Sequence, residues 1–466
     1  MEPTFNGRRQ HTPDSWMGRH ETMAEQGAGE GPSGWRFMLR ALGHHNYRLY
    51  FIGQGVSLVG TWLTRVATAW LVYRLSGSAL LLGVVGFCGQ IPTFLLAPVA
   101  GVLVDRWDRH RLLVVTQALA MLQSLALAVL ALSGVIAVWH VAALSVVQGL
   151  INAFDLPARQ AFVVELVTDR ADLPNAIALN SSIFNAARLV GPSVAGGLIA
   201  WVGEGGCFLI DAISYVAVLA SLLAMRVVRR PREHASQHLL TELKEGFTYV
   251  FHSPPIRALL LLLAMVSLLG LPFAVLMPVM ASEVLKGGPN TLGVLMAASG
   301  LGALAGGGFL ASRRTVEGFG RVIALTAVLF GVGLVAFALS RHVVLSVLTL
   351  VVTGYGMMVS LAASNTLLQT LVEERMRGRL MSIYAMAFVG TAPFGSLLAG
   401  GLAARIGAPA TIALGGGVCV AVAGWFYVKL PSLKARARPV SERLGLLPRV
   451  ASGMREATRR METVED

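Results

Sequence analysis

The stretch Gly101-Val-Leu-Val-Asp105-Arg106-Trp-Asp108-Arg109-His-Arg111 separates two long apolar segments of the chain. Charged residues crowd into this short turn, whereas the flanking segments, near 78–104 and 111–133, carry almost none. As helices rising about 1.5 Å per residue, such segments are long enough to cross roughly 30 Å of hydrocarbon. The pattern predicts two membrane-spanning helices joined by a charged turn.

Composition extends this prediction to the whole chain. Hydrophobic residues make up 55% of the 466 residues and charged residues only 14%, against about 45–50% and about 25% in an ordinary soluble domain. We therefore expect an all-α membrane protein rather than a soluble one. Twelve spans are expected, near residues 48–73, 78–104, 111–133, 138–158, 174–201, 207–228, 256–282, 290–312, 320–340, 343–368, 378–404 and 409–430.

The spans divide into two related halves. Ala195-Gly196-Gly197-Leu198 recurs as Ala399-Gly400-Gly401-Leu402, and the longest polar connection lies midway. Matched halves are typical of secondary transporters whose site lies between them. We expect two pseudo-symmetric six-helix bundles, arranged as a disordered cytoplasmic tail (1–46), the first bundle (47–228), a cytoplasmic linker (229–255), the second bundle (256–430) and a basic cytoplasmic tail (431–466).

The basic residues predict the orientation. Of 38 Lys and Arg residues, only Arg74, Lys286, Arg341 and Arg405 fall in loops of the predicted outer side, and positive loops stay in the cytoplasm. Residues 1–46 lack the apolar core of a signal peptide. We expect a multi-pass protein of the cell membrane with both termini cytoplasmic. The net charge of +13 does not indicate nucleic-acid binding, because the charges punctuate apolar segments.

Polar residues on several spans fall on one helical face. Steps of three or four residues join Gln54, Ser57, Thr61, Arg65 and Thr68 on the first span, and Ser145, Gln148, Asn152, Asp155 and Arg159 on the fourth. Polar side chains are unfavourable in lipid, so these faces should line a water-filled cavity; hydrogen bonding between helices is the alternative.

Five charges lie at or near membrane depth: Arg65, Asp155, Arg159, Arg188 and Asp211. Isolated charges are costly there, so we expect pairs. Depth along the helices permits Arg65 with Asp211 and Asp155 with Arg188. Each pair could be a structural ion bridge or part of a proton relay, and Asp155 is the first candidate for coupling to protons.

The chain from about 47 to 430 resembles the major facilitator superfamily. The family's loop after the second span reads Gly, any, Leu, any, Asp, Arg, any, Gly, Arg, Arg or Lys, and the matching residues are Gly101, Leu103, Asp105, Arg106 and Arg109; Asp108 replaces a glycine. In the family this gating loop latches the halves together. We expect Asp105 to sit at the positive N-terminal end of the helix that starts near Gly378 and an arginine to pair across the gate. The second half has Ser312 in place of the acid, which predicts a weaker latch there.

Narrower features resemble the family's drug and proton antiporters. Gly191-Pro192-Ser-Val-Ala-Gly196-Gly197 on the fifth span looks like their Gly-Pro signature, in which small residues allow close helix packing. Against proton coupling, Ser145 stands where many such exporters have arginine. The likeness extends to the branch of enterobactin exporters and macrolide efflux proteins, on Gly53-Gln54, Ser57 to Trp62, Asp155 to Arg159 and Asp211 to Tyr215.

The resemblance implies a cavity lined by the first, fourth, seventh and tenth spans. The predicted substrate cavity consists of Gln54, Ser57, Thr61, Gln148, Asn152, Met265, Tyr355 and Met357. Thioethers adapt to varied shapes, so a bulky, partly apolar siderophore or drug is expected, exported in exchange for protons. The alternatives are a lipid or lysolipid flippase or scramblase and a permease subunit driven by a separate ATPase.

No enzyme is indicated. No lysine follows a glycine, so a P-loop is absent, and neither GxSxG nor HExxH occurs. The ten histidines and three cysteines form no cluster with metal-ligand spacing. We expect no cofactor or metal, and as partners a small-molecule substrate, protons and membrane lipids, with no nucleic acid and a monomeric state.

Overall fold

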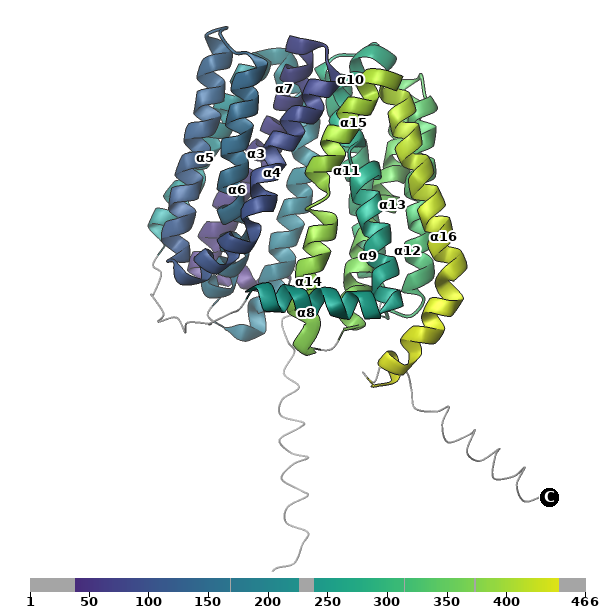
Figure 1. Ribbon diagram of the computed structural model, residues 1–466. Coiled ribbons are helices and arrows are strands. Elements are labelled where there is room, and N and C mark those ends of the chain that lie inside the picture. Colours follow the sequence, from purple (N-terminus) through teal and green to yellow (C-terminus); the bar gives the residue numbers. More distant parts are fainter. Residues whose placement is uncertain (1–37, 168, 226–238, 314, 373, 444–466) are drawn as a thin grey trace, which may run out of the picture.

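The computed structural model describes residues 38–167, 169–225, 239–313, 315–372 and 374–443. In these ranges the chain forms helices and no strand. The helices stand in two bundles side by side, as Figure 1 shows. The expectation of an all-α membrane protein with the major facilitator architecture is confirmed.

The first bundle contains five long helices. A short 3₁₀ turn, η2 (Arg40–Gly43), precedes the first of them, and a second, η3 (Arg170–Asp172), precedes the last. The long helices are α3 (His45–Ser76), α4 (Ala79–Arg106), α5 (Arg109–Leu132), α6 (Val138–Leu166) and α7 (Leu173–Ala224).

Helix α7 supplies two spans, because the chain reverses at Gly203, whose φ of 72° interrupts the helical backbone. Contacts with α3 show the reversal. Gly55 lies against Ile183 and Trp62 against Gly191, so this part of α7 runs parallel to α3. Beyond Gly203 the order is opposite: Gly53 lies against Ser221, and Gly60 against Asp211.

The second bundle has spans that are interrupted. Its seventh span is α9 (Pro254–Met265), the π-helical turn η4 (Val266–Gly270), α10 (Phe273–Val279) and a second π-helical turn, η5 (Met280–Val284). Its eleventh span is split. The remaining helices are α11 (Pro289–Ala311), α12 (Phe319–Leu339), α13 (Val343–Thr370), the pair α14 (Glu374–Phe388) and α15 (Ala392–Ile406), and α16 (Ala408–Arg443).

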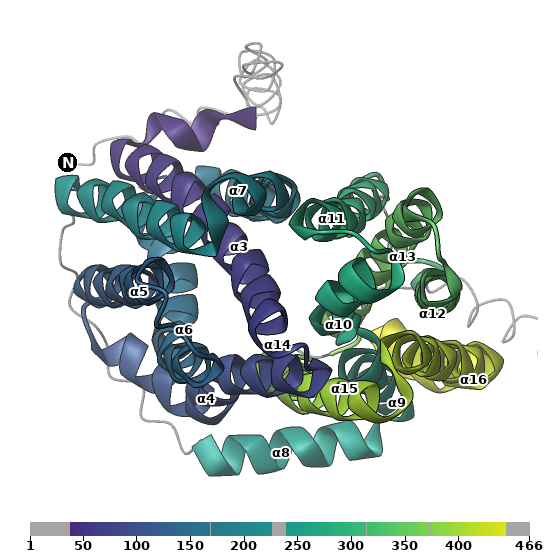
Figure 2. The ribbon, with the colours of Figure 1, turned by 90° about the horizontal axis from the view of Figure 1, so that it is seen from above.

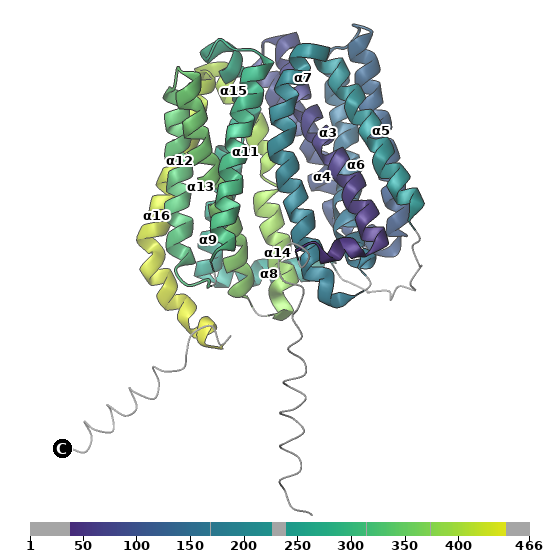
Figure 3. The ribbon, with the colours of Figure 1, turned by 180° about the vertical axis from the view of Figure 1, so that it is seen from behind.

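Eleven helical segments of the described residues are long and apolar enough to cross a membrane. Since α7 folds back on itself, they give twelve crossings, as predicted. We call the end with Gly203 and Gly407 the Gly203 end, and the opposite end, where α8 (Leu239–His252) lies, the α8 end. In Figures 1 and 3, α8 crosses the base of the molecule at a large angle to the spans.

Residues 38–46 are ordered, which contradicts a disordered tail up to residue 46. The expected linker contains α8, and α16 continues through 431–443, the start of the expected basic tail. Residues 1–37, 226–238 and 444–466 lie outside the described residues.

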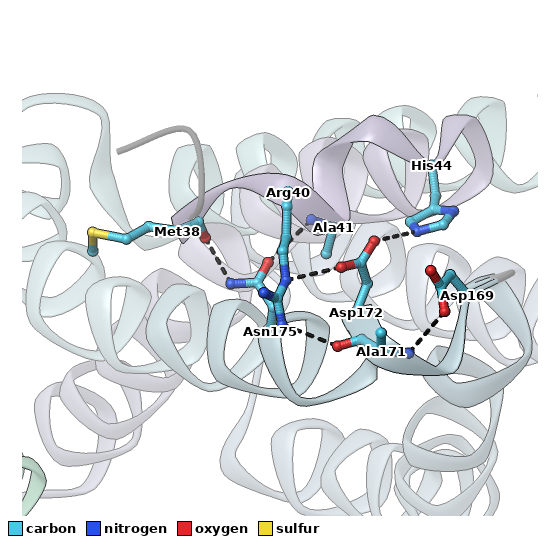
Figure 4. A network of polar contacts seen from close by, with 8 residues as sticks. All are labelled: Met38, Arg40, Ala41, His44, Asp169, Ala171, Asp172 and Asn175. Atoms are coloured by element: carbon cyan, nitrogen blue, oxygen red, sulfur yellow. Dashed lines mark hydrogen bonds and ion pairs between the residues drawn. The ribbon is translucent and has the colours of Figure 1, made fainter. Parts of the chain in front are cut away.

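Residues 38–44 are ordered because they dock on the start of α7 (Figure 4). Asp172 forms an ion pair with Arg40, with its carboxylate 2.8 Å from Nε, and contacts His44 Nε2 at 3.0 Å. Asn175 accepts from the Ala41 N–H at 3.0 Å and donates to the Met38 carbonyl oxygen at 2.8 Å. The start of the first span is thereby fixed to the start of the fifth.

Candidate functional site

The two bundles meet along α4 with α15 and along α7 with α11. In Figure 2, which looks down on the bundle, α3 crosses the centre of the molecule diagonally, between the rest of its own bundle and α10 and α11. Helix α3 also contacts α10 and α11. The site between the bundles is therefore bounded on one side by α3.

At the Gly203 end the bundles touch through glycines. A methyl group placed on Gly83 of α4 would lie 2.6 Å from the carbonyl oxygen of Ser396 on α15, and one on Gly400 would lie 2.8 Å from that of Ala79. Such distances are below van der Waals contact, so only glycine allows these backbones to approach so closely.

The predicted Gly-Pro packing motif makes the second such contact. A methyl group on Gly196 of α7 would lie 2.8 Å from the carbonyl oxygen of Pro289, and one on Gly293 of α11 would lie 2.8 Å from that of Pro192. Gly191 packs within its own bundle against Trp62 of α3. Gly197 is exposed and would meet no atom of the described residues within 4 Å, so it takes no part in this packing.

Toward the α8 end the same helices separate. On α11, a methyl group on Gly300 would lie 3.3 Å from the Arg188 carbonyl oxygen, whereas one on Gly308 would meet no described atom within 4 Å. Gly101 on α4 and Gly378 on α14 are equally free of neighbours in the described part of the chain. The bundles are thus closed at the Gly203 end and apart at the α8 end.

A polar contact joins the bundles at the closed end. The Tyr73 hydroxyl at the end of α3 donates to the carboxylate of Glu283 in η5. Nearby, Arg74 pairs with Glu204 at 2.7 Å within the first bundle. The sequence prediction missed Glu283, although it is an acidic residue close to the end of a span.

Among the described residues, the contacts of the gating loop lie within the first bundle. Arg109 donates to Glu165 of α6 at 2.7 Å, and Asp108 caps α5 by accepting from the Arg111 N–H at 3.1 Å. Arg106 is exposed at this end, and the pairing of an arginine across the bundles stays a prediction. The side chain of Asp105 lies outside the described part of the structure, so its helix-dipole contact stays a prediction.

The predicted polar face of α3 changes its surroundings along the helix. Gln54 and Ser57 are buried, with 3% and 1% of their surface exposed, because this end of α3 packs against α6 and the second part of α7. Thr61 is half-buried and Arg65 is exposed. The prediction that Gln54 and Ser57 face a cavity is therefore wrong in this conformation, whereas Thr61 and Arg65 remain accessible.

The other predicted cavity residues are partly accessible. Gln148 donates to Asn152 one turn along α6 at 3.1 Å, and both are half-buried. In the second bundle Met265 and Tyr355 are half-buried and Met357 is buried. Together with Thr61, these residues belong to helices of both bundles.

Asp155 pairs with a different arginine from the one predicted. Its carboxylate, 3% exposed, is paired with Arg159 one turn along α6 and accepts from Gln117 at 2.6 Å and Thr116 at 2.9 Å on α5. Arg188 is not its partner. A neighbour at i+4 on the same helix is nearer than any residue of α7. The polar residues of α5 were the signal that would have indicated this cluster.

Asp211 also differs from the prediction. It is 2% exposed and accepts from Thr64 at 2.8 Å, Ser124 at 2.9 Å and Ser214 at 3.5 Å. It has no basic partner in the described part of the chain, so the pairing with Arg65 is wrong. The second part of α7 turns this carboxylate toward α5 and the buried side of α3.

Arg65 and Arg188 consequently have no carboxylate partner among the described residues. Arg65 instead lies over the ring of Trp62, with its guanidinium carbon 4.8 Å from the ring centroid. Trp62 in turn packs edge-on against Phe184 of α7, at 6.1 Å between centroids. Within the described ranges, no group of three His, Cys, Asp or Glu residues could hold a metal ion.

The second bundle differs from the first in that two of its spans are interrupted. Helix α14 ends at Phe388 and α15 begins at Ala392. The Phe388 carbonyl oxygen accepts a hydrogen bond from Ser267, a buried residue of the π-helical turn η4. The interruptions of the seventh and eleventh spans are thereby linked. Pro393, at the start of α15, was visible in the sequence but was not interpreted as the mark of a break.

Residues 38–455 match the family described as transmembrane secretion effector. The chain is 26% identical to a staphyloferrin A transporter of Staphylococcus aureus, over 83% of this chain and 97% of the relative. It is 29% identical to the multidrug efflux pump Tap of Mycolicibacterium fortuitum, over 76% and 88%. A macrolide efflux protein A of Streptococcus pyogenes is 24% identical over 82% and 96%.

Solved structures share the fold. A bacterial homologue of the lysosomal transporter Spinster, in an inward-facing and unoccupied conformation, matches with a TM-score of 0.62 and 14% identity, over 85% of this chain and 97% of the other. A POT family transporter in complex with 5-aminolevulinic acid matches with a TM-score of 0.67 and 12% identity, over 83% and 96%.

Proposed function

The chain belongs to the transmembrane secretion effectors, a family of major facilitator efflux transporters and not of enzymes, and on this premise we propose that it exports a bulky, partly apolar small molecule in exchange for protons. The substrate is a siderophore-like or drug-like solute. Transport proceeds by alternating access, with the two bundles, near 47–228 and 256–430, rocking about the site between them.

One observation carries this proposal. The contacts between the bundles are closest at the Gly203 end and are lost at the α8 end, from Gly293 to Gly308 on α11 and from Gly83 to Gly101 on α4. A structure closed at one end and open at the other is one of the two states that alternating access requires. The excess of Lys and Arg on the α8 side supports a cytoplasmic position for that side.

The substrate class is supported by two independent facts. The accessible residues between the bundles combine thioether, aromatic and hydroxyl groups, in Met265, Tyr355 and Thr61, which suits a bulky solute with few polar groups. Of the relatives named above, one is a staphyloferrin A transporter, one a multidrug efflux pump and one a macrolide efflux protein. The protein works as a monomer in the cell membrane, with both termini cytoplasmic.

Proton coupling is assigned to the buried carboxylates. Asp155 is the first candidate, because protonation would weaken its pairing with Arg159 and so change the packing of α5 against α6. Asp211 is the second, since its charge is offset only by hydroxyl groups. Both lie in the first bundle.

The test is transport in proteoliposomes under an imposed pH gradient, with a panel of siderophores, macrolides and lysolipids. We expect uptake of a siderophore or macrolide into inside-out vesicles that depends on the gradient, is lost in Asp155→Asn and is kept in Arg405→Gln, which changes an exposed residue at the end of α15. Unchanged proton-driven transport in Asp155→Asn would remove Asp155 from the mechanism.

The flippase alternative predicts a different result in the same vesicles. Lysolipid would cross without any pH gradient, and the siderophores and macrolides would not accumulate. That outcome would replace the export of soluble molecules as the function of this protein.

A further inference from the structure

Two arginines, one on α3 and one on α7, lie where these two helices pack together. Arg65 follows Trp62 by one turn, and Arg188 lies between Phe184 and Gly191, the two residues of α7 that pack against Trp62. Both arginines therefore lie beside the same aromatic residue, Trp62. The Arg188 backbone also borders Gly300 of α11, so this position lies where the two bundles meet.

Neither charge is neutralised by the described residues. The buried carboxylates described in the first bundle are already committed, Asp155 to Arg159, Asp211 to hydroxyl groups and Glu204 to Arg74. Among the described residues, no hydrogen bond or ion pair involves the guanidinium of Arg65 or Arg188, and the helices facing them, α10 and α11, contain no acidic residue.

An uncompensated pair of like charges at membrane depth is unfavourable, and intramembrane charges are usually paired or face water. Arg65 is exposed and Arg188 is half-buried, so both are accessible to a solute between the bundles. Guanidinium groups bind carboxylate and phosphate groups with two parallel hydrogen bonds. An anion at this position would compensate both positive charges.

We propose that Arg65 and Arg188 form a binding site for the anionic group of the exported solute, with Trp62 and Phe184 contacting its apolar body. The substrate would then be an amphiphilic acid. This inference rests on the proposed function and narrows its substrate class. The T-shaped pair of Trp62 and Phe184, 6.1 Å between centroids, places an apolar aromatic surface directly beside the cations.

The test uses 1-pyrenebutyrate and its uncharged amide, which differ only in the carboxylate. Binding to the full-length protein in nanodiscs of zwitterionic lipid is followed by energy transfer from tryptophan to pyrene, with Trp62→Phe identifying the contribution of Trp62. Since a hydrogen bond to a charged group has a net effect of about tenfold or more in affinity, we expect the acid to bind at least about tenfold more tightly than the amide.

The variants separate charge from folding. Arg65→Gln and Arg188→Gln should each reduce the preference for the acid to within about threefold, with the affinity for the amide unchanged, whereas Arg65→Lys keeps part of it. Arg405→Gln changes an exposed arginine at the end of α15 and should keep the full preference for the acid. Equal binding of acid and amide by the unmodified protein, binding of neither, or an unchanged preference in the double variant would overturn the inference.

Two further measurements separate this inference from the proposed function. If both probes are exported under a pH gradient without preference, export stands and the anion site fails. If the acid is preferred in binding but neither probe is exported, the anion site stands and the transport proposal fails. Competition by added phosphatidylglycerol would support the anion site and identify a lipid headgroup as its occupant.

Discussion

The two bundles have the same number of spans but differ in what interrupts them. The first bundle carries all five charges at membrane depth on helices that run without a break through each span. In the second bundle, the described spans keep their charged residues near the ends, and two of them are broken, by the π-helical turns η4 and η5 and between α14 and α15.

This difference suggests a division of labour. Buried charges need fixed partners, and the rigid helices of the first bundle hold them, as with Asp155 between α5 and α6. Broken helices bend at their interruptions, and here the interruptions lie beside the contact with α4. We infer that the first bundle binds the proton and the charged group of the solute, and that the second contacts the solute only through adaptable apolar side chains and supplies most of the bending.

Removing the charge of Asp155 should have the largest effect, and this effect is on the stability of the protein. Asp155→Ala leaves the half-buried Arg159 without its partner, which should lower the free energy of unfolding by about 3 kcal/mol. Thermal unfolding of the purified protein measures the change. The double variant Asp155→Ala/Arg159→Ala should recover about half of the loss. A single variant as stable as the unmodified protein would contradict the assignment of these charges as a structural pair.

Filling the break should affect movement rather than binding. A methyl group on Gly390, between α14 and α15, would lie 2.6 Å from the ring of Phe94 on α4. Gly390→Val should therefore slow export about tenfold by overpacking this contact, while 1-pyrenebutyrate affinity stays the same. Gly417→Val is the matched control, since Gly417 has no described neighbour within 4 Å. Equal effects of the two variants would argue against a hinge here.

Uncoupling the two breaks should have a smaller effect. Ser267→Ala removes the hydrogen bond to the Phe388 carbonyl oxygen, worth about 1 kcal/mol, and should shift the balance between open and closed states about fivefold. Spin labels at Arg106→Cys and Arg377→Cys, both exposed at the α8 end, report the populations. Ser432→Ala on α16 removes a comparable bond to Lys429 and should leave them unchanged.

Replacing thioethers should have the smallest effect. Met265→Leu and Met357→Leu keep the volume and polarity of these side chains, so export rates should change by less than about twofold. Transport of a chemically varied panel measures the breadth of substrates. A tenfold loss from either change would mean that the second bundle recognises the solute specifically, and the proposed division of labour would fail.

The sequence predicted the spans well, because length and hydropathy alone decide whether a helix crosses a membrane. It predicted charge pairs poorly. Depth allowed Arg65 to meet Asp211, but depth says nothing of how a helix is rotated, and Asp211 faces Ser124. Depth also does not give the tilt of a helix in the bundle. Gln54 and Arg65 share one face of α3, yet one is buried and the other exposed, because α3 leaves its own bundle as it crosses the centre (Figure 2).

The docking of η2 on the start of α7 has a consequence for biosynthesis. The bond from Arg40 to Ala171 joins residues 131 positions apart. At roughly 5–20 residues per second of synthesis, the first span waits on the order of ten seconds before the segment that anchors it has been made. During that interval its polar residues, Arg65 among them, must be accommodated without their final neighbours, which makes the translocation machinery or early-emerging helices the expected temporary hosts of this span.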